Sequence, residues 1–196
     1  MPYNPNIHHR RSIRLKGYDY SQAGLYFVTI CCENREHRFG KIENGEMILN
    51  DAGKIADECW MEIPKHFPNA VLHEHIVMPN HVHGIIELVN DANVGTRHVV
   101  SLPNTTDNPV GTSHGMSLQE PKINQFGKPI AGSLSVIINQ YKSSVKRWCN
   151  KNGHEYFKWQ SRFHDHIIRN EQSYQTISDY IINNPAKWKD DKFYTE

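Results

Sequence analysis

The chain has 196 residues, of which 38% are hydrophobic and 10% are aromatic, and its formal net charge is +1. A chain of this length and composition is expected to form one globular domain with its own core, which excludes a disordered or fibrous protein. No apolar run is long enough to span a membrane, and residues 1–16 are polar and basic, unlike a signal peptide.

Cysteine usage indicates a reducing compartment. The four cysteines show no C-x-x-C spacing, so we expect reduced, buried thiols and a cytoplasmic protein. They are Cys31, Cys32, Cys59 and Cys149.

Charge is unevenly spread along the chain. Both ends carry more Lys and Arg than Asp and Glu, whereas residues 41–90 are acidic. In a basic arm at residues 1–20, Arg10, Arg11 and Arg14 are interleaved with tyrosines, a pattern that suits the phosphates and bases of nucleic acid. A frayed terminus and ordinary solvated surface are the alternative interpretation.

Hydrophobic periodicity and turn signals predict a chain of mixed strands and helices. The expected elements of the first half are a strand at 25–32, a hairpin at 39–49 around Asn44-Gly45, a helix from Asn50 or Asp51 to about residue 66, and strands at 71–78 and from 81. Those of the second half are a helix from Ser133, a short strand at 163–169, and a helix at 171–184 that Asn170 caps and Pro185 ends. The strands at 71–78 and from 81 should pair antiparallel, and Pro64 makes the last turn of the first helix doubtful.

Residues 21–196 are expected to form a single domain with a flexible insertion at 90–131, where Asn, Thr, Gly, Pro and Ser dominate without periodicity. The helix from Ser133 has an apolar stripe that includes Tyr141. Core packing is therefore a better interpretation of this tyrosine than a role as a nucleophile. Lys142 and Lys146 lie on other faces of that helix and are candidates for phosphate contacts.

The run from Val77 to Glu87 carries two histidines, His81 and His83, at the start of an expected strand. Side chains at i and i+2 of a strand point to the same face, so the two imidazoles should project together as potential metal ligands. A pair of polar residues on a half-exposed strand is the alternative, and two further H-x-H pairs occur in the chain.

The last helix places Tyr180 and Asn184 one turn apart on one face. A tyrosine beside a divalent cation can attack phosphorus, and an amide oxygen with two imidazole nitrogens suits Mg²⁺ or Mn²⁺. A partly buried helix tyrosine and a C-terminal helix residue are the simpler interpretation.

The stretch from Met78 to Gly84 resembles the His-hydrophobic-His motif of single-tyrosine transposases of the insertion-sequence type. Three later stretches, 159–163, 166–170 and 179–185, resemble one branch of them, the REP-associated tyrosine transposases, which act on hairpin-forming repeated extragenic palindromes. The similarity runs in order from Leu25 to Trp188, apart from the hairpin near 40–49 and the insertion.

The resemblance implies an α+β, ferredoxin-like fold, an antiparallel sheet with helices packed on one face. It implies that His81 and His83 bind the metal and that Tyr180 is the nucleophile. Asn184 occupies the position of a metal-binding Gln in related transposases, as it does in the REP-associated branch. The implied reaction is attack by Tyr180 on single-stranded DNA, which leaves a 5′-phosphotyrosine and a free 3′-hydroxyl.

Three basic side chains in the matching stretches, Arg162, His166 and Arg169, serve either DNA contacts or the polar face of a strand. The expected partner is single-stranded or hairpin DNA, and the protein is a monomer or a homodimer. A domesticated hairpin-binding module without cleavage, and a phosphodiesterase that uses water, are the alternative functions.

Overall fold

The computed structural model describes residues 18–90 and 130–195. The basic arm with Arg10, Arg11 and Arg14, and nearly all of the expected insertion, lie outside these residues. Within them, no helix has the length and apolar character that a membrane span requires.

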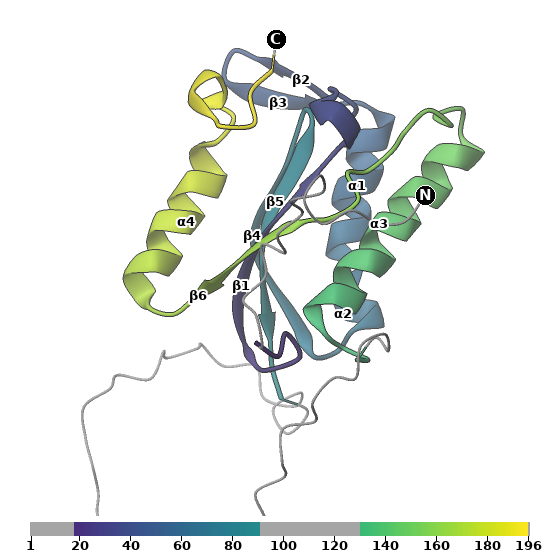
Figure 1. Cartoon of the computed structure of the whole chain (residues 1–196). Coiled ribbons are helices and arrows are strands. Elements are labelled where there is room, and N and C mark those ends of the chain that lie inside the picture. The colour runs from purple at the N-terminus through teal and green to yellow at the C-terminus, as the bar shows by residue number, and fades with distance from the viewer. Residues whose placement is uncertain (1–17, 91–129, 196) are drawn as a thin grey trace, which may run out of the picture.

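A four-stranded antiparallel sheet forms the centre of the fold (Figure 1). Its strands, in spatial order, are β4 (Ala70–Met78), β5 (His81–Leu88), β1 (Gly24–Cys31) and β6 (His164–Ile168). One long helix connects β1 to β4 and another connects β5 to β6, which is the β-α-β-β-α-β arrangement of ferredoxin-like folds. The predicted fold class and the antiparallel pairing of β4 with β5 are confirmed.

One face of the sheet carries the main core, which is covered by α1 (Asp51–Met61), α2 (Ile63–His66) and α3 (Leu134–Lys151). The predicted apolar stripe of α3 is buried there, and the Tyr141 hydroxyl donates a hydrogen bond to the Ala56 carbonyl at 3.0 Å. Tyr141 is therefore a core residue, as expected.

The first predicted helix is divided into two. The Asn50 side chain caps α1 by accepting a hydrogen bond from the Gly53 N–H at 2.9 Å. The chain then begins the separate α2 with Pro64 in its first turn, where the missing proline N–H costs no helical hydrogen bond.

Helices cover both faces of the sheet, whereas the resemblance implied one. α4 (Glu171–Asn183) lies opposite α1 and α3, and its Ile181 joins a second, smaller core with Leu25, Ile85 and Ile168 (Figure 1). Alternation along the strands points Leu25 and Ile85 away from the main core, so this face is apolar and needs a helix to cover it.

His73 and His75, which form one of the further H-x-H pairs, are half-buried and make contacts inside the fold. His73 lies between α4 and the sheet, with Nδ1 3.1 Å from the Tyr174 hydroxyl and Nε2 3.2 Å from a Glu87 oxygen. His75 lies on the other face, 2.9 Å from a carboxylate oxygen of Asp57. These contacts between distant segments have no signal in the spacing of the histidines.

The predicted hairpin is confirmed as β2 (Gly40–Glu43) and β3 (Glu46–Leu49), with positive φ at Asn44 and Gly45. It forms a separate two-stranded sheet at the end of the molecule where β1 ends and β5 begins (Figure 1). A short helical turn, η1 (Glu33–Arg35), follows β1, and η3 (Trp188–Asp190) lies near the C-terminus.

Gly84 of β5 provides a test of the main core. A Cβ added at Gly84 would lie 2.2 Å from Cζ2 of Trp60, whose side chain is fully buried. We expect Gly84→Ala to lower the free energy of unfolding by about 1–3 kcal/mol, measured by denaturant titration. The double variant Gly84→Ala/Trp60→Phe should lose less than the sum of the two single variants, and strictly additive losses would contradict this packing.

Candidate active site

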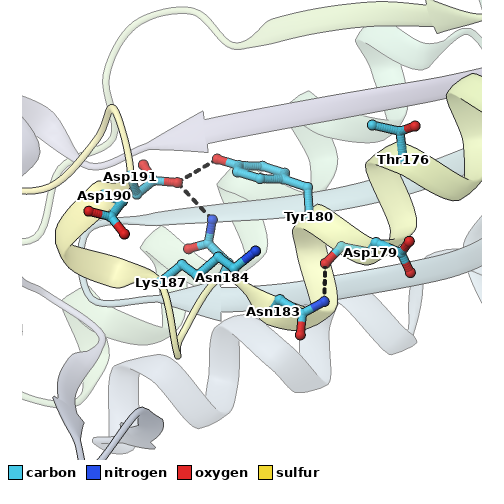
Figure 2. Close-up of a pocket in the computed structure, with 8 residues that line it drawn as sticks. All are labelled: Thr176, Asp179, Tyr180, Asn183, Asn184, Lys187, Asp190 and Asp191. Carbon is cyan, nitrogen blue, oxygen red and sulfur yellow. Dashed lines mark hydrogen bonds between the residues drawn. The ribbon is translucent and has the colours of Figure 1, made fainter.

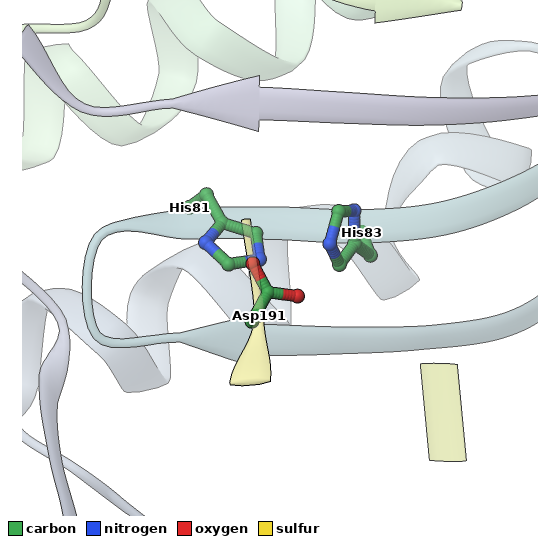
Figure 3. Close-up of side chains that lie close together, drawn as sticks. All are labelled: His81, His83 and Asp191. Carbon is green, nitrogen blue, oxygen red and sulfur yellow. The ribbon is translucent and has the colours of Figure 1, made fainter. Parts of the chain in front are cut away.

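The two histidines of β5 lie on the face covered by α4, directly after the Pro79-Asn80 turn. Their rings are fully buried, and their centroids are 4.2 Å apart (Figure 3). The expected shared orientation is thus present, and both imidazoles lie inside the fold rather than on its surface.

Each imidazole is oriented by a neighbouring polar side chain. Nδ1 of His81 lies 2.7 Å from Oδ1 of Asn80, and Nδ1 of His83 lies 2.8 Å from the Thr29 hydroxyl. Since an amide oxygen only accepts, His81 donates through Nδ1 and carries its free lone pair on Nε2. Burial lowers the pKa of both rings below the usual histidine value, so both are neutral and suited to bind a cation near neutral pH.

α4 brings Tyr180 to these histidines. Its hydroxyl lies 3.0 Å from Nε2 of His83, and its side chain is 36% exposed. It lines an open cavity of about 330 Å³ with Asn184, Lys187 and other residues of α4 and η3 (Figure 2). The nucleophile candidate is therefore in contact with both the histidine pair and solvent.

Asp191 is the residue that sequence reasoning missed. Its carboxylate accepts hydrogen bonds from the Tyr180 hydroxyl at 2.5 Å and from Nδ2 of Asn184 at 2.7 Å (Figure 2). It also accepts one from the Phe193 N–H at 2.6 Å. These bonds hold the pKa of Asp191 below its usual value although burial opposes this, and burial together with Asp191 raises the pKa of Tyr180. Asp191 follows Asp190 directly, and nothing in the sequence distinguishes the two.

The donor atoms fit a divalent cation. One ligand atom each of His81, His83 and Asp191 lie within 4.8 Å of one another (Figure 3). Nε2 of His81 and Oδ1 of Asn184 are buried without a hydrogen-bond partner among the described residues, which is costly for lone pairs that bind nothing. Imidazole, carboxylate and amide donors together suit Mn²⁺ or Mg²⁺.

The chain after η3 closes over the histidines. The Phe193 ring lies 4.9 Å from the ring of His81 and 5.6 Å from that of His83, measured between centroids. Nδ2 of Asn80 donates to the Phe193 carbonyl at 2.9 Å, which ties this segment to the turn before β5.

The two lysines of α3 that are predicted to contact phosphate also make hydrogen bonds within the fold. The ammonium group of Lys142 donates to the Gln160 carbonyl at 2.7 Å, and that of Lys146 donates to the carbonyls of Glu155 and Phe157. Both lysines therefore tie the loop after α3 to the helix, an arrangement that leaves fewer donors for phosphate.

The three basic residues near β6 are exposed and separate from the histidine pair. His166 and Arg169 line a second cavity of about 460 Å³ between β6 and the start of α4, and Arg162 precedes β6. Their assignment to DNA remains a prediction.

No family model matches the chain. A Haemophilus influenzae protein described as uncharacterized is 40% identical over 194 residues, 99% of this chain and 98% of that protein, and the two belong to one family. A putative REP-associated tyrosine transposase of the same organism is 22% identical over 176 residues, 86% of this chain and 74% of that protein. The chain is a relative of the REP-associated tyrosine transposases.

A solved structure shares the fold of this chain. The REP-associated tyrosine transposase bound to a REP hairpin superposes with a TM-score of 0.52 and 20% identity, over 89% of this chain and 74% of that one. The resemblance to the REP-associated tyrosine transposases is confirmed, and so is the antiparallel α+β fold.

The role of Asp191 can be tested by removing its charge. We expect Asp191→Asn to weaken Mn²⁺ binding by about 10- to 100-fold in isothermal titration, because an amide is a poorer cation ligand than a carboxylate. Asp190→Asn, on the exposed neighbour, is the matched control and should leave the Mn²⁺ affinity unchanged. Equal Mn²⁺ affinity of Asp191→Asn and the unmodified protein would remove Asp191 from the ligand set.

Proposed function

We propose that this chain is a metal-dependent endonuclease and strand transferase, which cuts single-stranded DNA near a hairpin through a 5′-phosphotyrosine at Tyr180. The observation that carries the proposal is the position of the Tyr180 hydroxyl, 3.0 Å from His83 and 2.5 Å from Asp191. A phenol within a cluster of metal-ligand side chains is placed for nucleophilic attack on a phosphate, whereas a tyrosine that only packs a helix requires no such neighbours.

The substrate class rests on kinship and on exposed charge. The related transposase of known structure is bound to a REP hairpin. In this chain Arg162 and Arg169, which lie on either side of β6, are exposed, and such charges favour a phosphate backbone. A DNA hairpin with an unpaired strand is therefore the proposed substrate.

The reaction exchanges one phosphate ester for another. Tyr180 Oη bonds to phosphorus while the bond from phosphorus to the 3′-oxygen of the preceding nucleotide breaks, and that oxygen takes up a proton to become a 3′-hydroxyl. Oδ2 of Asp191 already accepts a hydrogen bond from the phenol, so it is the nearest acceptor for the phenolic proton. A 3′-hydroxyl can later attack the phosphotyrosine and rejoin a strand, with no water or nucleotide cofactor.

His81, His83 and Asp191, with Oδ1 of Asn184, would hold the divalent cation. Such a cation polarises the scissile phosphate and stabilises the charge that develops on it. Because the Tyr180 hydroxyl donates its one proton to Asp191, Nε2 of His83 is the donor in its 3.0 Å contact with that hydroxyl. If His83 held a cation through Nε2, the ring would carry its proton on Nδ1 and the Tyr180 hydroxyl would lose this contact.

The proposal is tested by incubating the protein with a labelled library of single-stranded DNA hairpins and Mn²⁺, and resolving the products on a denaturing gel. We expect a protein-linked DNA band that a chelator abolishes. Hairpin binding without any linked product would favour the domesticated binding module, and cleavage without a linked product would favour water as the nucleophile.

A further inference from the structure

A third cavity, distinct from the one lined by His166 and Arg169, lies beside the active site and is not part of the proposed chemistry. Its volume is about 580 Å³, and it separates the β2–β3 hairpin from the segment 185–195. Ile42 and Gly45 line one wall, Pro185, Ala186 and Trp188 line the other, and Pro79 of the turn before β5 also contributes. We refer to this cavity as the hairpin groove.

The charge of the hairpin groove is positive. Lys41, Lys187 and Lys189 line it, against Asp190 as the one acid among its lining residues, and Lys41 forms an ion pair with Glu43. Lys187 and Lys189 are exposed and form no ion pair within the described part of the chain. Cations left without carboxylate partners along a concave surface attract a polyanion.

The hairpin groove is continuous with the active site. Lys187 and Asp190 line both the groove and the cavity around Tyr180. Trp188 lines the groove, and its ring lies 5.9 Å from the ring of His81 between centroids. A chain whose phosphate sits at Tyr180 would therefore reach the groove within a few nucleotides.

The shape favours an unpaired strand over a duplex. A Cβ built at Gly45 lies 3.6 Å from the Cα of Ala186, so the two walls touch at the tip of the hairpin. With the walls in contact there and a volume of about 580 Å³, the groove cannot take in a double helix, whereas single nucleotides can enter it. The half-buried Tyr194, whose ring packs against that of the buried Trp188, adds aromatic surface of the kind that unpaired bases use in single-strand binding sites.

We propose that the hairpin groove binds the unpaired DNA flank that continues from the phosphate at Tyr180. This inference rests on the proposed function, and it assigns recognition of the flank to β2–β3 and the segment that faces it. The stem of the DNA hairpin would then bind elsewhere, and the flank would add affinity of its own.

The test measures binding without cleavage, in a Tyr180→Phe background. The probes are the library hairpin that this protein binds most tightly, either bare or with about eight unpaired nucleotides on its 5′ or its 3′ side. One flank should strengthen binding. Lys189 lines the groove but not the cavity around Tyr180, and Lys189→Glu should remove part of that gain, on the order of threefold, and lower the salt dependence by about one counterion. Affinity for the bare hairpin should change little.

Two further variants make the result specific. Lys41→Glu changes the opposite wall, away from Asp191, and should weaken flank binding in the same direction. Lys54→Glu/Lys65→Glu reverses two exposed lysines of α1 and α2 and is the matched control, which should keep the full flank gain.

Three results would overturn the inference. The first is no gain in affinity from either flank. The second is an equal loss of affinity for flanked and bare hairpins in the groove variants. The third is an equal loss of affinity in the control variant. If the unmodified protein still forms the covalent product under any of these results, the proposed function stands and only the groove assignment fails. If no hairpin binds at all, both fail.

Discussion

Tyr180→Phe should abolish the protein-linked DNA product while hairpin affinity changes less than about threefold. The substitution removes one oxygen, and the phenylalanine ring keeps its contact with Phe27, whose centroid lies 6.3 Å away. No other group of α4 can take over the bond to phosphorus, so the expected loss is at least about 10⁴-fold, the scale on which removal of a nucleophile acts. Gel quantification of linked product and a binding titration on the same DNA measure the two effects.

The matched control is Tyr174→Phe on the same helix. The Tyr174 hydroxyl donates to Glu74 at 3.0 Å, and no contact joins it to His81 or His83. This variant should still form the linked product. Loss of the linked product in Tyr174→Phe but not in Tyr180→Phe would show that Tyr174, and not Tyr180, is the nucleophile.

His81→Ala should lower the rate of product formation by about 10²- to 10³-fold. A bound cation lowers the free energy of the charged transition state by several kcal/mol, and the variant should lose part of this stabilisation. Binding of Mn²⁺ should weaken in parallel. A thermal melt must accompany the measurement, since His81 is fully buried and its removal leaves a space beneath Phe193.

His75→Ala separates these effects. His75 is stacked on Trp60 on the opposite face of the sheet and bonds Asp57, so its loss affects packing without touching the candidate site. The His75→Ala variant should be less stable than the unmodified protein and should still form the linked product. Cleavage by folded His81→Ala at the unmodified rate would rule out the metal assignment.

Much of the fold follows from local sequence signals. The Asn44-Gly45 turn, the caps at Asn50 and Asn170, and the apolar stripe of α3 each depend on neighbouring residues alone, and the structure has each of them where expected. The placement of α4 on the second face of the sheet could not be predicted from neighbouring residues. It depends on which strand residues face away from the main core, and that requires the sheet order.

The residues of the candidate site also differ in whether local sequence could predict them. The i, i+2 spacing of His81 and His83 and the i, i+4 spacing of Tyr180 and Asn184 are local, so sequence could propose each pair. Asp191 joins them only because the chain turns back after α4, so that its carboxylate meets the phenol and the amide. The same applies to His73, whose partners Tyr174 and Glu87 come from different elements.

The most direct measurement is mass spectrometry of the linked product after digestion with nuclease and trypsin. Cleavage after Arg169 and Lys187 yields one peptide that contains both Tyr174 and Tyr180, and fragmentation locates the attached nucleotide within it. We predict a nucleotide joined through its 5′-phosphate to Tyr180. A nucleotide on Tyr174 or on any other residue, or no linked peptide where cleavage occurs, would contradict the proposed nucleophile.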